Sequence, residues 1–309
     1  MKKVNITIIG TINKDTIILP DKKTIKSFGG ILFNILSLSY LGGEKAKLFP
    51  VCNLGYDVFP EVKGHVKSLT NVNPSGITKV KNKNNHAFLY YDKTGDRKEI
   101  LKNSVPELTF QKIKPFLKSD VLLVNFISGF DLSLATLKRL RKDSNALIYT
   151  DLHSLTLGIK KNGQRFLRAP PRWKEWVSQT EILQMNFFEF LTLAKKRLKT
   201  LNEIKDFGSE ILNLGVRFVL VTRGEKSGYF IYREKNEVGI KRIKVPKIKK
   251  VKDTTGCGDV FSAAFILSYL NGKKPQKAFE IANFTATQKC KFSGIENLGK
   301  LKNFKDKIF

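Results

Sequence analysis

The chain has 309 residues, of which 41% are hydrophobic, and this is enough to build a sizeable core. Its three cysteines, Cys52, Cys257 and Cys290, form no Cys-x-x-Cys pair, which argues against a disulfide framework or a zinc site. No apolar run reaches the roughly 20 residues that a membrane span needs, and the run at residues 4–9 is too short for a signal peptide. We therefore expect a cytoplasmic protein that does not enter the membrane.

The net charge of +29 raises the question of a nucleic-acid partner, because 56 Lys and Arg residues stand against 27 acidic ones. The basic residues are spread along the whole chain, however, without a basic arm and without an RNA-binding signature. We interpret the charge as a compositional bias that would still attract an anionic substrate. We expect no specific complex with nucleic acid.

The first strand is predicted at residues 4–9, and polar residues Asn13 and Asp15 follow it closely. Ligands of open α/β sheets gather at the carboxyl ends of the strands, so these two side chains are candidates for binding hydroxyl groups. The alternative is an ordinary polar turn after a strand.

A helix pattern begins after Gly29 and Gly30 and ends near Gly42. Asn34 is a polar residue inside this apolar helix. A buried amide needs hydrogen-bond partners, which a substrate could supply. The alternative is that Asn34 lies on an exposed face of the helix.

Strands and helices alternate along the rest of the chain. Buried strands are predicted at residues 48–52, 121–126, 146–151, 182–185 and 217–221, and helices at 131–141, 260–270 and 277–291. A hairpin turn is predicted at residues 92–95, between strands at 86–91 and 97–101. This alternation indicates an α/β protein with a mainly parallel sheet that helices cover.

The most informative segment is Asp253-Thr-Thr-Gly-Cys-Gly-Asp259, which lies where a loop turns into an apolar helix. Glycines let the backbone adopt positive φ, and a helix start presents unpaired N–H groups and the positive end of the helix dipole. Gly256, Cys257 and Gly258 therefore predict an anion hole. At its edge, the carboxylate of Asp259 could receive a proton from a hydroxyl that attacks phosphorus. The alternative is a plain turn in which Asp259 only caps the helix.

This segment resembles the C-terminal signature of the ribokinase-like sugar kinases, the PfkB carbohydrate kinase family. Other motifs follow in the family's order, from Gly10 to about Gly294. The resemblance implies a three-layer α/β/α fold with a mainly parallel central sheet. It implies that residues 1–309 form one kinase domain, with a small β lid formed by about residues 12–27 and 86–103.

The resemblance also implies roles for single residues. Asp259 would be the catalytic base, and the backbone of Gly256, Cys257 and Gly258 would bind the transferred phosphoryl group. The residues implied to hold the acceptor are Asn13, Asp15, Gly29, Gly30 and Asn34. Those implied to contact the nucleotide are Asn186, Thr222, Gly224 and Asn283.

The cofactors that the resemblance implies are ATP and Mg²⁺. The magnesium ion would lie near Asn186 and Glu189, mainly through water, since oxygen ligands suit it. The alternative for this Asn-x-x-Glu pair is an ordinary helix cap. Some family members bind a monovalent cation such as K⁺ at positions that match Asp253 and Thr255.

The implied function is ATP-dependent phosphorylation of a hydroxyl group of a sugar or polyol. The short polar side chains near residues 13–34 favour an unphosphorylated acceptor, and Arg97 in the predicted lid is the residue that could contradict this. The expected partners are thus ATP and a small sugar or polyol, with a second copy of the chain docking through the lid.

Two alternatives stay open. The first is a nucleoside kinase, because the fold does not fix the substrate. Phe33, Phe88 and Tyr90 could then form an aromatic shelf for a base. The second is a non-catalytic or nucleic-acid-binding protein on the same fold, against which the intact Gly256-Cys257-Gly258-Asp259 run argues.

Overall fold

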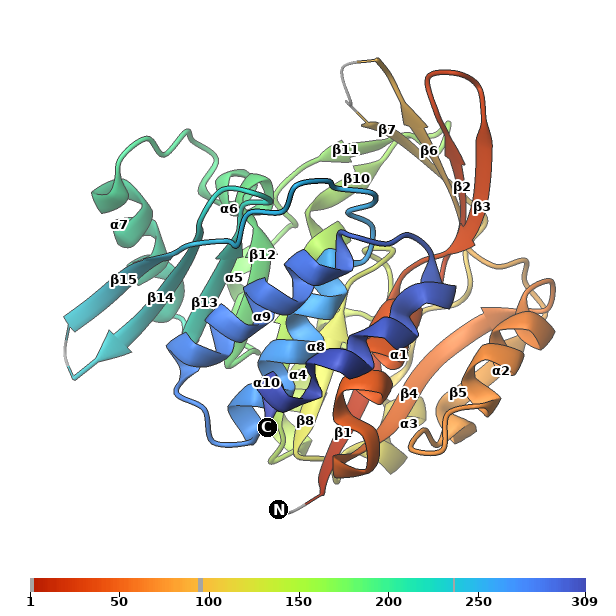
Figure 1. The fold of residues 1–309 in the computed structure, drawn as a ribbon, viewed down its shortest axis with the longest axis horizontal. Helices are drawn as coiled ribbons and strands as arrows, with labels where there is room; N and C mark the ends of the chain where they lie inside the picture. Colours follow the sequence, from red (N-terminus) through yellow and green to blue (C-terminus); the bar gives the residue numbers. More distant parts are fainter. Residues whose placement is uncertain (1–2, 94–96, 236) are drawn as a thin grey trace.

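A large central sheet organises the molecule, seen in a computed structural model that describes residues 3–93, 97–235 and 237–309 (Figure 1). Within these ranges the sheet contains nine strands. In spatial order they are β15 (Glu237–Ile243), β14 (Gly228–Glu234), β13 (Phe218–Thr222), β12 (Ile182–Asn186), β9 (Leu147–Asp151), β8 (Val121–Asn125), β1 (Val4–Ile9), β4 (Ala46–Gly55) and β5 (Ile77–Val80). Neighbours from β13 to β5 pair in parallel, and within the described part of this sheet only β14 and β15 add antiparallel pairings. The predicted parallel sheet is confirmed.

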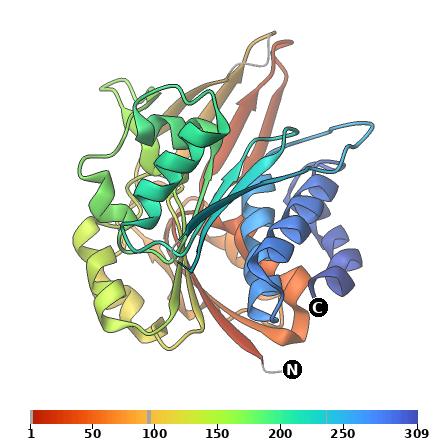
Figure 2. The same cartoon turned by 90° about the vertical axis from the view of Figure 1, so that its left-hand side faces the viewer.

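Helices cover both faces of this sheet (Figures 1 and 2). One face carries α1 (Ile31–Gly42), α2 (Phe59–Lys67), α8 (Cys257–Leu270), α9 (Pro275–Lys289) and α10 (Lys305–Ile308). The other carries α3 (Phe110–Ile113), α4 (Leu134–Asp143), α5 (Trp173–Val177), α6 (Phe187–Ala194) and α7 (Leu201–Leu212). Shorter 3₁₀ helices are Gly43–Lys45, Pro74–Gly76, Lys114–Phe116, His153–Thr156 and Ile295–Phe304.

The two cores follow from the alternation of side chains along each strand. In β8, Val121 and Leu123 enter the core under α1 and α8, whereas Leu122 and Val124 enter the opposite core. Helix α8 is buried along residues 259–268, because it packs on the sheet and also against α1 and α9. A helix that is apolar on nearly every side fits such a place. The Asp253–Asp259 segment is thus attached to one of the most enclosed helices among the described elements.

A second, smaller sheet rises beyond one end of the large sheet (Figure 1). Its order is β3 (Thr24–Phe28), β2 (Lys14–Ile18), β6 (His86–Tyr91) and β7 (Arg97–Lys102). A hairpin of β10 (Leu157–Ile159) and β11 (Arg165–Leu167) approaches it through a bridge between Ile100 and Gln164. The segments predicted for a lid contain these four strands. That the small sheet closes over a ligand stays a prediction, and residues 94 and 95 of the predicted hairpin turn lie outside the described residues.

The predicted start of the helix at residues 131–141 is wrong. The helix expected from residue 131 begins at Leu134, because the hydroxyl group of Ser133 accepts a hydrogen bond from Thr136 N and caps it. Asp131 instead lies in a buried turn, where its carboxylate accepts bonds from Thr11 Oγ1 and from Ser128 N. Across the described ranges, no helix combines the length and apolar character that crossing a bilayer requires.

Candidate functional site

The carboxyl ends of the central strands meet the start of α8. Asn125, the last residue of β8, donates a hydrogen bond from Nδ2 to Asp259 Oδ1 at 2.8 Å. Gln184 in β12 donates from Nε2 to Gly258 O at 3.1 Å. These bonds fix the Gly-Cys-Gly-Asp segment at the strand ends, where open α/β sheets bind their ligands.

The loop before α8 has the backbone conformation that its glycine predicts. Gly256 has φ of 76°, and a Cβ atom at this position would overlap the ring of Phe33. Only glycine meets both conditions without strain. Gly258 is exposed, and α8 begins at Cys257. The first turn of α8 therefore contains an accessible glycine backbone, which suits an anion.

The expectation that the Cys257 N–H group binds the anion is not met in this conformation. Cys257 N donates to Thr254 O at 3.2 Å and closes a turn of the loop. Thr255 N donates to Asp253 Oδ1 at 2.8 Å in the same loop. The loop thus uses some of its own N–H groups to hold its shape, so fewer of them are available to an anion than the three consecutive groups predicted from the sequence.

Asp259 is only 8% exposed although it lies next to the exposed Gly258. Burial raises the pKa of its carboxyl group to about 7, while the hydrogen bond from Asn125 and the nearby ammonium group of Lys289 oppose the rise. A carboxylate whose pKa lies near neutrality is well suited to accept a proton from a hydroxyl group.

Asn34 lies beneath Asp259 and does not reach open space. Its side chain is 0% exposed and its Nδ2 donates to Ser262 Oγ at 2.9 Å and to Asp259 O at 3.3 Å. Its Oδ1 accepts from Asn125 Nδ2 at 2.9 Å. The structure therefore corrects the expectation that Asn34 grips the acceptor. It supports the first turn of α8, because protein groups already satisfy its amide.

The other predicted acceptor residues lie together at the start of α1. Gly29 N donates to Asn13 O at 2.9 Å, and a Cβ atom on Gly29 would overlap the carboxylate of Asp15. Asn13 and Asp15 are 7% and 6% exposed, and within the described chain no hydrogen-bond partner reaches Asn13 Oδ1. A buried amide oxygen without a partner calls for an explanation, and a ligand hydroxyl group would provide one.

Sequence reasoning missed a polar chain behind the motif. Tyr149 OH donates to Gln184 Oε1, and Gln184 Nε2 donates to Asp151 Oδ2 at 2.7 Å. Burial raises the pKa of Asp151 well above its usual value, and repulsion from Glu189 and then from Asp259 adds to the rise. The sequence signal that could have found them is the one used for Asn13, a polar residue at the carboxyl end of a buried strand. Asn125 and Asp151 each end such a strand.

Asn186 and Glu189 form a capping box at the start of α6. Glu189 N donates to Asn186 Oδ1 at 3.0 Å, and Asn186 N donates to Glu189 Oε2 at 2.8 Å. The helix-cap alternative thus describes their geometry. In the ranges that the structure covers, no three acidic, His or Cys side chains form a metal cage. The oxygen donors of Glu189 and Asp151 fit a Mg²⁺ ion held mainly through water and phosphate oxygens.

The remaining predicted nucleotide residues lie at separate places along this edge. Thr222 ends β13 beside Asn186, and Gly224 follows it with φ of 58° and is exposed. Asn283 lies on α9 and is 6% exposed, and its Nδ2 has no hydrogen-bond partner among the described residues. The structure brings Thr222 and Asn186 together, while Asn283 approaches from the helical layer.

The predicted monovalent-cation position is already occupied by a lysine side chain. Lys289 Nζ lies 2.9 Å from Asp253 Oδ2, and Lys289 is 0% exposed. Thr255 contributes its N–H group to the same carboxylate. Asp253 and Thr255 therefore do not fit the cation role that the resemblance implies.

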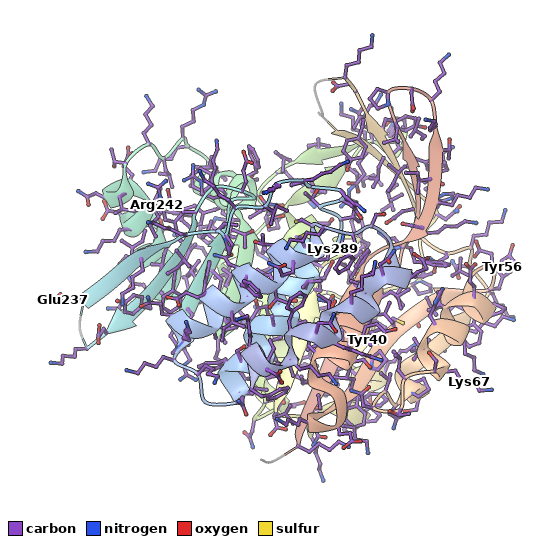
Figure 3. The ribbon with its side chains drawn as sticks, viewed as in Figure 1. Tyr40, Tyr56, Lys67, Glu237, Arg242 and Lys289 are labelled. Atoms are coloured by element: carbon purple, nitrogen blue, oxygen red, sulfur yellow. The ribbon has the colours of Figure 1, made fainter. Side chains whose placement is uncertain are left out.

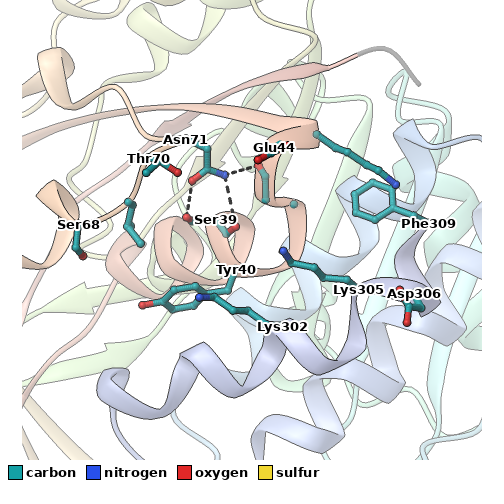
Figure 4. A pocket seen from close by; sticks show the side chains of 14 residues that line it. Ser39, Tyr40, Glu44, Ser68, Thr70, Asn71, Lys302, Lys305, Asp306 and Phe309 are labelled. Atoms are coloured by element: carbon teal, nitrogen blue, oxygen red, sulfur yellow. Dashed lines mark hydrogen bonds between the residues drawn. The ribbon is translucent and has the colours of Figure 1, made fainter.

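A cavity of about 670 Å³ lies elsewhere, at the other end of α1 (Figure 4). Ser39, Tyr40, Asn71, Lys302 and Lys305 are among the residues that line it. None of the predicted site residues lines it, so it is separate from the strand-end site.

Comparisons with known proteins identify relatives of this chain. Residues 156–298, which contain the Asp253–Asp259 motif, match the family described as pfkB family carbohydrate kinase. The chain is 24% identical over 277 residues to a cytidine kinase of Thermococcus kodakarensis, and the match covers 87% of this chain and 90% of that protein. It is 33% identical over 114 residues to a ribokinase of Arabidopsis thaliana, and the match covers 37% of this chain and 29% of that protein.

The structure of ribokinase from Giardia lamblia superposes with a TM-score of 0.77 at 16% identity, over 100% of this chain and 99% of that chain. At this identity the superposition shows the fold, which is the ribokinase-like fold predicted from the sequence.

Proposed function

We propose that this chain, which belongs to the ribokinase-like PfkB family, transfers the γ-phosphoryl group of ATP to a hydroxyl group of a sugar or polyol. The observation that carries the proposal is the place of Asp259. It combines burial, a pKa of about 7 and a position next to the exposed Gly258 at a helix start. A base and an anion site side by side are what in-line transfer to an alcohol requires.

In this mechanism Asp259 orients the acceptor hydroxyl group and receives its proton as the oxygen attacks phosphorus. Asn125 and Asn34 hold the carboxylate and its backbone in place. The backbone at Gly258 and the positive end of α8 stabilise the charge on the transferred group. Mg²⁺ near Glu189 and Asp151 would supply further neutralisation of the phosphate oxygens.

The acceptor is proposed to lie between the strand ends and the small sheet, against Asn13, Asp15 and the Gly29-Gly30 backbone. Their short polar side chains suit several hydroxyl groups. Asp15 pairs with Ala87 across β2 and β6, so it shares a face of the small sheet with Ala87 and Leu89. That face is mostly aliphatic and carries the Asp15 carboxylate, which favours a neutral, hydroxylated acceptor.

A nucleoside acceptor remains the second candidate, because the cytidine kinase relative matches most of the chain. The shelf predicted from aromatic residues is not supported, however. Phe33 is 2% exposed beneath Gly256, and Phe88 pairs with Thr16 on the face of the small sheet opposite to Asp15. Tyr91 follows on the Asp15 side of β6 and is half-buried, so it is the residue that could stack on a base.

Arg165 is a buried cation that the sequence did not single out. It is 6% exposed, and its Nη2 donates to Ser128 O at 2.8 Å beside the strand ends. Burial lowers the pKa of Arg165, and the carboxylates of Glu99 and Asp131 oppose this. We retain a neutral acceptor because of the Asp15 carboxylate, and we treat sugar acids as competitors in the test because Nε and Nη1 of Arg165 have no hydrogen-bond partner among the described residues. The side chain of Arg97, the other cation considered, lies outside the described residues.

The test is ADP release with ATP and Mg²⁺ across ribose, fructose, inositols, sugar acids, sugar phosphates, adenosine and cytidine. We expect the highest kcat/KM for a neutral sugar or polyol. A preference of more than tenfold for a nucleoside, about 1.4 kcal/mol in transition-state binding, would establish the second candidate instead. A preference of that size for a sugar acid or a sugar phosphate would show that Arg165 or Arg97 binds the anionic group of the acceptor. A chain that releases no ADP with any acceptor would contradict the kinase proposal itself.

A further inference from the structure

We infer that the buried ammonium group of Lys289 replaces a monovalent cation at the loop before α8, so that the phosphoryl transfer proposed above needs no added K⁺. The inference rests on that proposed function. It also opposes what the family resemblance implies for Asp253 and Thr255.

The geometry places the ammonium group inside the loop. Lys289 Nζ donates to Asp253 Oδ2 at 2.9 Å and to Asp253 O at 3.3 Å. It also lies 5.7 Å from the centroid of the Phe33 ring, which packs beneath Gly256. Figure 3 labels Lys289 on α9, near the end of the helix that faces the small sheet. The ammonium group of Lys289 therefore interacts both with Asp253 at the start of the loop and with the Phe33 ring beneath Gly256.

A metal cation would need the same oxygen atoms. Carboxylate and carbonyl oxygens are what K⁺ would bind here, and Lys289 already uses one of each from Asp253. A second cation beside the ammonium group would meet like-charge repulsion in a poorly solvated site. Lys289 is fully buried, and a buried lysine is retained only when it is paired and hydrogen-bonded.

The ion pair holds the loop in the shape that the anion site needs. Lys252 N donates to Cys290 O at 2.8 Å, and Asp253 N donates to the same oxygen at 3.4 Å. These bonds and the Lys289–Asp253 pair attach the loop to the end of α9. Burial alone would raise the pKa of Asp253, but the hydrogen bond from Thr255 and the pairing with Lys289 lower it. Lys289 is therefore a positioning residue, which acts through the loop on Gly256 and Asp259.

The experiment compares the parent protein with Lys289→Ala, which opens space for a small cation next to Asp253. Lys291→Ala is the matched control, because Lys291 is exposed and its Nζ bonds only to Gln288 in the structure described. ADP release is measured in chlorides of K⁺, NH₄⁺, Na⁺ and tetramethylammonium at constant ionic strength. We expect the parent and Lys291→Ala to keep the same rate within twofold in all four salts. We expect the rate of ADP release by Lys289→Ala to fall at least tenfold in tetramethylammonium. Adding K⁺ or NH₄⁺ should restore most of that rate, with a saturating dependence on the cation concentration.

A second readout does not depend on catalysis. The Tm of Lys289→Ala should rise with K⁺ or NH₄⁺ more than with tetramethylammonium, and the Tm of the parent should respond equally to all of them. Severalfold activation of the parent by K⁺, or a K⁺-specific rise of its Tm, would overturn the inference. So would a folded Lys289→Ala that no cation rescues. If Lys289→Ala does not fold, Lys289→Met keeps the volume but leaves no room for a cation, so its rate should fall at least tenfold in all four salts, and a rate like that of the parent would overturn the inference. If the parent shows no turnover with any acceptor, the proposed function fails, while the Tm measurements still judge the cation inference.

Discussion

Acid should inactivate the enzyme with a midpoint near pH 7, because only ionised Asp259 can receive the acceptor's proton. Its pKa is raised to about 7, so roughly one-tenth of the molecules carry the ionised form at pH 6. An ordinary carboxyl group with the value 3.8 would be almost fully ionised there. We therefore expect kcat/KM to fall about tenfold per pH unit below pH 7.

The variant Asn125→Leu tests the origin of this value. Asn125 donates to Asp259 Oδ1 at 2.8 Å, and this bond lowers the pKa that burial raises. A hydrogen bond to a charged group contributes about 1.5–3 kcal/mol, and about 1.4 kcal/mol corresponds to one pKa unit. Removing the bond should thus move the acid limb up by roughly one to two pH units.

The assay is the pH profile of kcat/KM between pH 5 and 9 for the parent, for Asn125→Leu and for a control, Asn213→Leu. Asn213 is an exposed residue at the end of α7, far along the chain from the motif, so its profile should match the parent. Asp151 and Lys289 also influence Asp259 electrostatically, and both variants leave them in place. A parent profile that stays flat down to pH 5 would refute the assignment of Asp259. An unchanged limb in a folded Asn125→Leu would refute the role of the hydrogen bond.

Three further outcomes follow from the same geometry. Asp259→Asn should reduce turnover by roughly 10²–10⁴-fold, and it should also stabilise the fold. The folded pKa of about 7 exceeds the unfolded value of 3.8, so ionised Asp259 destabilises the fold by up to about 4 kcal/mol above pH 7, and this effect disappears below about pH 4. Urea unfolding at pH 8 that shows no gain would contradict this account. Gly256→Ala should destabilise the protein by about 1–3 kcal/mol and impair turnover, because of its positive φ and the overlap with Phe33; a parent-like Tm and rate would show that the loop adapts. Asp15→Asn should lower kcat/KM for the best acceptor at least tenfold and leave the KM for ATP unchanged, and equal kcat/KM values would remove Asp15 from the acceptor site.

The sequence alone determined the features that depend on neighbouring residues. Apolar runs predicted the strands of the parallel sheet, because each buried strand needs a short continuous apolar segment. Gly256 predicted a left-handed turn before α8, which its φ of 76° confirms. The Asn186 and Glu189 pair predicted a helix cap as one of two readings, and the capping box shows that geometry. All of these patterns lie within a few residues along the chain.

The tertiary structure decided which polar groups share a site. Asn34 and Asp259 are 225 positions apart, and Asn125 and Asp259 are 134 positions apart, so no local pattern could indicate their bonds. The same holds for Lys289 and Asp253, which are separated by 36 positions. The pKa of Asp259 likewise follows from burial, which arises only when α8 packs between the sheet, α1 and α9. Burial and long-range contacts are properties of the packed chain, and they turned one predicted ligand into a support residue and a predicted metal position into an ion pair.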